Sequence, residues 1–229
     1  CGMPWLYRRG WFEERVFRFI LRHTALVTGC DGLAREYGRR YDRRLPYRVM
    51  PNWIDLERFN LPRERGEQKT VLFVHHLSKR KGADMIIPTA RLLPEVEFIV
   101  IGSGPEEKRI HAPNVRLIGG VPNKEISNYF ARANVFFMPS EEEGFPHVLL
   151  EAMAAGIPYV ASDVGAVREI TPPELQSFVS GPAVGFCPRA PFRRSAKMLP
   201  VIFTAAMSAA KKSYGPNSSA ARRKCKKEP

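Results

Sequence analysis

The sequence predicts an α/β fold built on a parallel sheet with helices on both faces. Two observations lead to this prediction. Short, continuously apolar runs recur between residues 71 and 161, and segments whose apolar residues have helical spacing separate them. Strands that are apolar on both faces belong in the interior of a parallel sheet. The predicted domain is therefore Rossmann-like and doubly wound, a class of sheet whose ligands bind at the carboxyl ends of the strands.

The elements of this domain follow one another in regular order. Strands are expected at 71–74, 98–101, 115–118, 135–138 and 159–161. The helices expected between and after them are 83–93, 106–110, 123–131, 146–155 and 166–170. Pro146 suits the first helical position, because proline lacks the N–H group that would be unpaired there.

Three parts of the chain differ in pattern. Residues 1–60 are expected to contain helices at 11–22 and 31–40, the second capped by Asp31, and a strand at 47–50. Residues 61–186 open with a polar linker and form the Rossmann-like domain. Residues 187–229 hold eleven Lys and Arg with a single Glu and little periodicity, which predicts a disordered tail. A shifted reading frame or natural divergence would each account for this tail.

Composition excludes some classes of function. The chain has 229 residues, 44% apolar and 26% charged, which is typical of a globular protein. Its net charge of +13 is concentrated in the tail and in the Arg-rich first 49 residues. A nucleic-acid-binding protein carries positive charge on folded motifs, so we expect no nucleic-acid partner. The Arg-rich first segment is either a solvated surface or one that lies against anionic lipid headgroups.

Targeting signals and cysteine pairs are not expected. No run approaches the ~18 apolar residues of a membrane-spanning helix, and charged residues break up any signal peptide near the beginning of the chain. The four cysteines (Cys1, Cys30, Cys187 and Cys225) are too dispersed for a metal motif or a disulfide framework. The expected location is the cytoplasm, with or without peripheral contact at the inner face of a membrane.

Two loops follow the first two predicted strands. Residues 75–82 (HHLSKRKG) gather cationic and protonatable side chains just ahead of a helix, a place that suits phosphate. Residues 102–106 (GSGPE) are a poor dinucleotide fingerprint, because they follow the second strand and no third glycine has the right spacing. These glycines are expected to permit a tight turn and a close backbone approach.

The loop after the fourth strand is the most informative. In residues 140–151 (SEEEGFPHVLLE), Glu143 stands just before a helix and Glu151 eight residues later within it. Backbone amides at the helix start would form an anion site, and a carboxylate on each side would accept hydrogen bonds from sugar or ribose hydroxyls. Spacing alone equally allows acids that merely oppose the helix dipole and a solvent-facing Glu151.

Two segments carry a family resemblance. Residues 51–59 (PNWIDLERF) resemble the hinge of group 1, or family 4, glycosyltransferases. Residues 140–161 resemble the family's E-x7-E element followed by EAMA-x-G-x-P-x-V-A, and Asp163-Val164-Gly165 with Glu169 continues the pattern. The resemblance covers roughly residues 15–185.

The resemblance implies a GT-B fold, with two Rossmann-like domains of which this chain holds the C-terminal, nucleotide-sugar-binding one and a remnant of the N-terminal one. It implies that Lys81 binds phosphate, Glu143 contacts hydroxyls of the donor sugar and Glu151 contacts ribose. The donor would be a GDP-, UDP- or ADP-hexose, transferred with retention to a glycan or lipid-linked acceptor, without a metal or other cofactor. The backbone of the helix start would bind the distal phosphate, and the segment Arg116 to Val121 would line the base. The residues implied are Gly144, Phe145, Pro146, His147, Val148, Leu117 and Val121.

Departures from the family pattern keep alternatives open. The family usually has Gly-Arg where His75-His76 stand, so His76 replaces a permanently charged group with one that titrates near neutral pH. We take His76 as a candidate catalytic residue with Lys81 and Glu143. Most of the acceptor domain is expected to lie outside these residues. The alternatives are a non-catalytic nucleotide-sugar-binding remnant and a nicotinamide-dependent oxidoreductase.

Overall fold

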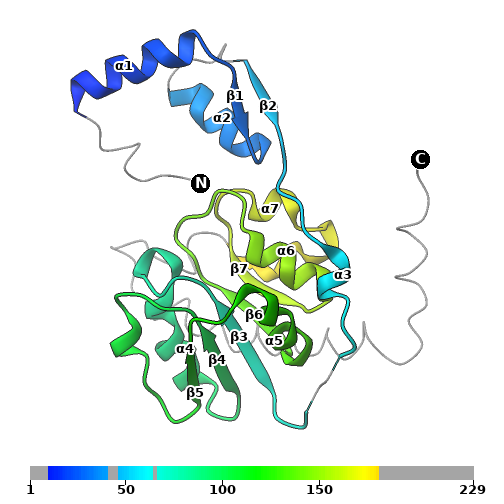
Figure 1. Ribbon diagram of the computed structural model, residues 1–229. Helices are drawn as coiled ribbons and strands as arrows, with labels where there is room; N and C mark the ends of the chain where they lie inside the picture. The colour runs from blue at the N-terminus through cyan, green and yellow to red at the C-terminus, as the bar shows by residue number, and fades with distance from the viewer. Residues whose placement is uncertain (1–9, 41–45, 64–65, 181–229) are drawn as a thin grey trace.

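The computed structural model describes residues 10–40, 46–63 and 66–180, and at its centre lies a six-stranded parallel sheet (Figure 1). The strands in spatial order are β5 (Val115–Gly119), β4 (Glu97–Ile101), β3 (Thr70–Val74), β6 (Val135–Met138), β7 (Tyr159–Ser162) and β8 (Val179–Ser180). From β3 the chain winds to one side as far as β5, and from β6 it winds to the other. This is the predicted doubly wound arrangement. The tail predicted for residues 187–229 lies outside the described residues.

Helices connect the strands largely as predicted. They are α4 (Ile86–Leu92), α5 (Ile126–Arg132), α6 (His147–Ala154) and α7 (Val167–Ile170). The prediction at 106–110 was wrong in extent, since this segment holds a single 3-10 turn, Glu107–Arg109. Pro146 was also misplaced. It precedes the first helical residue with an extended backbone, and its carbonyl accepts hydrogen bonds from Leu149 and Leu150. Pro146 thus occupies the N-cap.

Both faces of the sheet are packed, which explains the continuous apolar runs. Leu72 of β3 lies in the core cluster with Leu149 of α6, whereas its neighbour Val71 packs in a cluster with Ala90 of α4. Strand β5 is the exception, because it lies at the edge of the sheet and its Arg116 is exposed. The two residues of β8 escaped prediction because so short a strand leaves no apolar run.

A smaller unit precedes the sheet. It consists of α1 (Trp11–Arg22), β1 (Leu26–Thr28), α2 (Asp31–Arg40) and β2 (Tyr47–Val49), with β1 and β2 paired in parallel. The sequence placed both helices and the second strand within a residue of these bounds. The sequence did not predict the short helix α3 (Leu56–Phe59), which is capped by the Asp55 side chain. Phe59 anchors α3 in the main core, with its ring 5.7 Å from that of Phe130.

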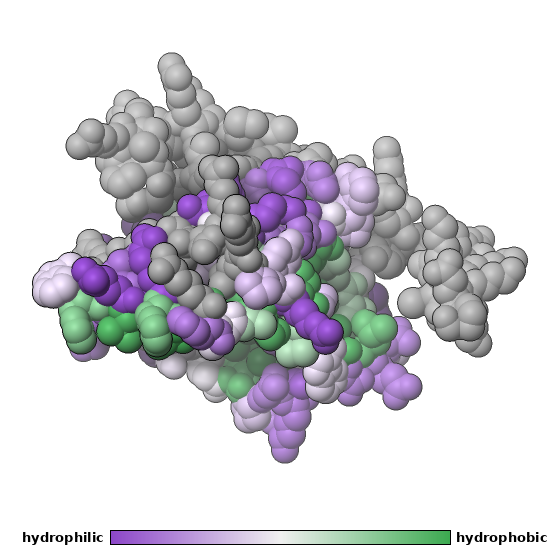
Figure 2. Space-filling view, turned by 90° about the horizontal axis from the view of Figure 1, so that it is seen from above, coloured by the Kyte–Doolittle hydropathy of each residue, from purple (hydrophilic) through white to green (hydrophobic). Residues whose placement is uncertain are grey.

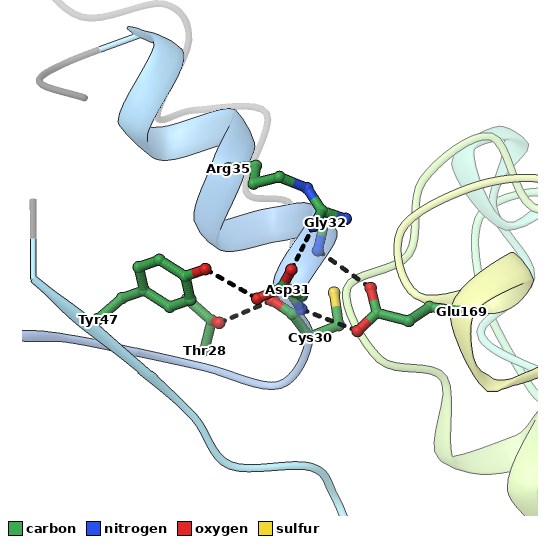
Figure 3. A network of polar contacts seen from close by, with 7 residues as sticks. All are labelled: Thr28, Cys30, Asp31, Gly32, Arg35, Tyr47 and Glu169. Carbon is green, nitrogen blue, oxygen red and sulfur yellow. Dashed lines mark hydrogen bonds and ion pairs between the residues drawn. The ribbon is translucent and has the colours of Figure 1, made fainter. Parts of the chain in front are cut away.

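A carboxylate joins the small unit to the sheet domain (Figure 3). Glu169 of α7 accepts hydrogen bonds from the backbone N–H groups of Asp31 and Gly32, each at 3.0 Å. Asp31, predicted to cap α2, is instead its first residue, and its side chain accepts a bond from the Tyr47 hydroxyl and pairs with Arg35. Capping therefore comes from another part of the chain, because the Asp31 side chain is held by these two partners.

Helix α1 exposes an apolar stripe. Its large exposed side chains are Trp11, Phe12, Val16, Phe19 and Ile20. Figure 2 shows hydrophobic side chains gathered along this edge of the molecule. Within the described ranges, no helix has the length and apolar content needed to cross a membrane.

Replacing Glu169 should weaken the contact between α7 and the start of α2. In Glu169→Gln the two backbone N–H groups face one acceptor oxygen and an NH2 group, so the start of α2 should lose about 0.5–2 kcal/mol of stabilisation. We expect faster hydrogen exchange at the amides of Asp31 and Gly32. The matched control is Glu125→Gln, an exposed glutamate on a 3-10 turn. Unchanged exchange at both amides would show that Glu169 does not hold α2.

Candidate functional site

The candidate site lies where β3 and β6 are neighbours. The chain leaves β3 toward β4 and leaves β6 toward β7, so the loops after these two strands diverge there. In doubly wound sheets, ligands bind at such a point. The two loops are also bonded to each other, because the amide of Glu141 donates to the carbonyl of Arg80 at 2.8 Å.

Gly82 lets the loops after β3 and β6 come this close, and Gly102 does the same for the loops after β3 and β4. Gly82 has a φ of 72°, and a Cβ there would lie 2.2 Å from the carbonyl oxygen of Pro139. Gly102 has a φ of 137°, and a Cβ there would lie 1.9 Å from the carbonyl oxygen of His75. Larger residues would force the loops apart. The close backbone approach expected of the 102–106 loop is confirmed.

Glu143 is the centre of the site. Its side chain is only 7% exposed, and its Oε1 contacts Lys81 Nζ at 2.9 Å and His75 Nε2 at 3.0 Å. Lys81 Nζ also donates to the backbone carbonyl of Glu142 at 2.9 Å. Burial acts to raise the pKa of Glu143, and the hydrogen bonds from His75 and Lys81 with the positive charge of Lys81 act to lower it; the pKa lies below its ordinary value. The site thus holds a buried carboxylate in its ionised form.

The two histidines have different surroundings. His76, the candidate from the sequence, is exposed, and no polar contact of its side chain is seen among the described residues. His75, which the sequence did not select, is the one that bonds Glu143. Adjacent histidines at the end of a strand point in different directions, and no periodicity in the sequence indicated which would turn inward.

Glu151 lies in the second turn of α6 and is partly buried. Within the described part of the chain its carboxylate accepts no hydrogen bond. Burial raises the pKa of Glu151, and the nearby positive charge of Arg58 acts in the opposite direction. Arg58 comes from α3 and donates to Asn123 Oδ1 at 2.9 Å, so the hinge segment supplies the nearest compensating charge. Among the described residues, Glu151 is therefore a partly buried carboxylate without a hydrogen-bond donor.

The start of α6 is held from two directions. Gly144 O accepts a bond from the amide of Ala166 at 2.8 Å, and Phe145 O accepts one from Asn52 Nδ2 at 3.0 Å. The amides of His147 and Val148, in the first turn, have no intrahelical acceptor. Of the residues 144–148 whose amides were expected to form an anion site, Pro146 contributes none, because it has no N–H group.

The two base-lining candidates lie on opposite faces of the sheet. Leu117 is within β5 and packs in the cluster that contains Phe73 and Ile86. Val121 lies beyond the end of β5 and packs in the cluster that contains Leu149 of α6. Val121 thus shares a face with the helix that carries Glu151, and Leu117 does not.

The match to a known family follows the same segments. The profile of the glycosyl transferases group 1 family matches residues 56–182, more than half of the chain, and the chain belongs to that family. The match begins at α3 and includes every strand of the main sheet.

Curated relatives share the same stretch. The phosphatidylinositol N-acetylglucosaminyltransferase subunit of Arabidopsis thaliana is 28% identical over 141 residues, covering 56% of this chain and 32% of that protein. Its human counterpart is 31% identical over 141 residues, and the match covers 56% of this chain and 29% of the human protein. Amylovoran biosynthesis glycosyltransferase AmsK of Erwinia amylovora is 32% identical over 137 residues, covering 51% and 34%. The chain spans about a third of the length of these relatives.

Solved structures agree on the fold. Sucrose-phosphate synthase from Thermosynechococcus elongatus superposes with a TM-score of 0.70 at 22% identity, covering 89% of this chain and 55% of that one. HepE of Anabaena, in complex with UDP, superposes with a TM-score of 0.68 at 18% identity, and the match covers 92% of this chain and 65% of HepE. The predicted GT-B class of fold is confirmed.

Replacing Glu143 with a neutral residue should lower the free energy of unfolding by an amount that depends on pH. A carboxylate whose pKa is lowered in the folded state stabilises the fold fully above its ordinary pKa of 4.5, and loses this contribution as pH falls through the lowered value. Wild type should exceed Glu143→Gln in free energy of unfolding by about 1–3 kcal/mol near pH 7, and the difference should shrink below pH 4.5. Urea unfolding across this range measures it, with Glu142→Gln as the control. A difference that is constant with pH would contradict the ionised assignment.

Proposed function

We propose that this chain is the donor-binding part of a retaining, family 4 type hexosyltransferase that uses a nucleotide-sugar. The observation that carries the proposal is the Lys81–Glu143 ion pair at the divergence of the β3 and β6 loops, with Glu151 on the helix that follows. Relatives named as glycosyltransferases and a UDP complex among the structural neighbours support it. The acceptor would be a glycan or lipid-linked hydroxyl.

The proposed chemistry is stabilisation of the departing nucleoside diphosphate. Lys81 has three N–H donors, of which two are used by Glu143 and the Glu142 carbonyl, so one is left for a phosphate oxygen. The leading amides of α6 at His147 and Val148 would add positive potential where charge develops. Glu143 would accept from hydroxyls of the sugar, Glu151 from ribose, and Val121 would lie against the base.

In this proposal these groups supply the charge, and no metal or organic cofactor is assigned a role. Within the described residues, no group of three or more His, Cys, Asp and Glu side chains is arranged to hold a metal ion. The positive groups proposed to act on the diphosphate are Lys81, the α6 amides and His76.

The oxidoreductase alternative is disfavoured by the 102–106 loop. Backbone from the β3 loop fills the space over its glycines, because a Cβ at Gly102 would meet the carbonyl of His75 and one at Gly104 would meet that of Leu77. A dinucleotide pyrophosphate requires an open approach to such glycines. A non-catalytic nucleotide-sugar-binding remnant uses the same site and differs only in turnover.

The small N-terminal unit is proposed as part of the acceptor side. Its α2 and β1 lie against the sheet domain through the contact of Asp31 and Gly32 with Glu169 and through the close approach of Gly29 to Phe145. The apolar stripe on α1 fits either the remainder of such a domain or a membrane surface, with Arg15 exposed on the same helix. Co-sedimentation with anionic and neutral vesicles distinguishes the two.

Calorimetric titration with UDP-glucose, UDP-N-acetylglucosamine, GDP-mannose and ADP-glucose tests the proposal, each sugar nucleotide being paired with its bare diphosphate. Binding of at least one pair, with the sugar form preferred, is the expected result. Failure of wild type to bind any of them would refute the nucleotide-sugar assignment.

Glu151→Gln should raise the free energy of unfolding and lower the affinity for nucleoside diphosphate. Because the pKa of Glu151 is raised by burial, the protonated form is favoured in the fold; this contribution is complete below pH 4.5 and lost as pH rises through the raised value. Near pH 7 the variant, which is always neutral, should unfold at a higher urea concentration than wild type. Its free energy of unfolding should be larger by ~1 kcal/mol or less. Its affinity for the bare diphosphate should fall by about 1–3 kcal/mol, through loss of a charged hydrogen bond to ribose. Unchanged diphosphate affinity would remove this role.

His76 should make diphosphate affinity depend on pH. If its charge faces phosphate, affinity is highest in acid and declines as the imidazole loses its proton, whereas a guanidinium keeps its charge throughout. His76→Arg should flatten the profile at the stronger level, and His76→Ala should flatten it at the weaker level. Titration of the three proteins from about pH 5.5 to 8.5 measures this. Parallel profiles would mean that His76 carries no phosphate charge.

A further inference from the structure

His75 has both ring nitrogens engaged. Nδ1 lies 2.8 Å from the backbone N–H of His76, and Nε2 lies 3.0 Å from Oε1 of Glu143. A backbone N–H can only donate, so Nδ1 must accept. The ring proton is therefore on Nε2, where it is donated to Glu143. One tautomer of the neutral imidazole satisfies both contacts.

The ring is fixed by its backbone as well as by these contacts. His75 continues the sheet through a hydrogen bond from its amide to the carbonyl of Ile101 at 3.1 Å. Its own carbonyl is packed against Gly102, where no side chain fits. The histidine side chain is 22% exposed, so it is held against Glu143 and not free in solvent.

The two donors to Glu143 contact the same one of its two carboxylate oxygens. His75 Nε2 and Lys81 Nζ both contact Oε1, which uses the two lone pairs of that oxygen. A hydroxyl that binds Glu143 must then be accepted by Oε2. With Lys81 alone, the carboxylate would keep its charge and could still rotate about that single contact.

We propose that His75 is a positioning residue for donor-sugar recognition, which fixes Glu143 through Nε2–H so that Oε2 is the oxygen presented to a sugar hydroxyl. This inference rests on the proposed function, since it assigns the sugar to Glu143. It makes His75 responsible for the preference for a nucleotide-sugar over its bare diphosphate. Affinity for the diphosphate alone does not depend on it, because Lys81 and the α6 amides remain.

The test uses the full chain with three substitutions. His75→Ala removes the donor, and His75→Gln keeps a side-chain N–H donor. His111→Ala removes an exposed histidine outside the site and is the control. Each protein is titrated calorimetrically with UDP-glucose, GDP-mannose and ADP-glucose and with UDP, GDP and ADP, and thermal unfolding establishes that each is folded.

The expected result is a change in preference and not in general affinity. His75→Ala should lower the ratio of sugar-nucleotide to diphosphate affinity about tenfold, as expected from one hydrogen bond to a charged group, with diphosphate affinity within about twofold of wild type. His75→Gln should recover most of the ratio, and His111→Ala should match wild type. An unchanged ratio in His75→Ala would overturn the proposal. So would a His75→Gln protein no better than His75→Ala.

A second measurement separates this proposal from the proposed function. In protein labelled with 15N-histidine, His75 should give a pyrrole-like Nε2 and a pyridine-like Nδ1 signal near neutral pH, and Glu143→Gln should shift the Nε2 signal. The opposite tautomer would overturn the positioning role whatever the protein binds. Loss of all nucleotide binding in wild type, with the expected tautomer present, would instead refute the nucleotide-sugar function and leave the hydrogen bond to Glu143 established.

Discussion

The site depends on close contact between the loops that follow β3 and β6. These segments are about sixty residues apart in the sequence, yet the parallel order of the sheet ends their strands side by side. Gly82 has no side chain to hold these two backbones apart, and Gly102 plays the same part between the loops after β3 and β4. The Glu141–Arg80 backbone bond fixes the relative position of the β3 and β6 loops. Only then can Lys81 and His75 reach Glu143. The electrostatics of the site are therefore a consequence of packing.

The two carboxylates of the E-x7-E element have opposite environments. Glu143 is buried among donors and keeps its charge, whereas Glu151 is partly buried and, among the described residues, has the nearby charge of Arg58 to compensate it. The first is satisfied before any ligand arrives, and the second is not. The partly buried carboxylate of Glu151 destabilises the unliganded protein because no donor among the described residues satisfies it. A ligand that donated a hydrogen bond to Glu151 would remove this destabilisation, and the energy regained would add to the ligand's affinity.

Much of this arrangement was readable from the sequence, and the exceptions have physical causes. The apolar strands were placed to within a residue because both sheet faces are buried, and the loops that carry Lys81 and Glu143 were correctly placed after the strands they follow. The inward turn of His75 depends on backbone geometry at the end of β3, which no residue pattern encodes. The capping of α2 was misassigned because Glu169, 138 residues away, does what a local Asp31 usually does. The short β8 and α3 are set by tertiary contacts, Phe59 in the core being one.

The contact made by Glu169 has a consequence for how the small N-terminal unit and the sheet domain of this chain can be recombined with those of relatives. Glu169 bonds main-chain N–H groups, so it recognises the beginning of a helix and not the side chains of that helix. Any N-terminal unit that presents a helix start in this position, without proline at residues 31 or 32, would satisfy the same carboxylate. Chimeric chains that exchange the small unit between relatives would keep this joint even where the exchanged sequences share few residues.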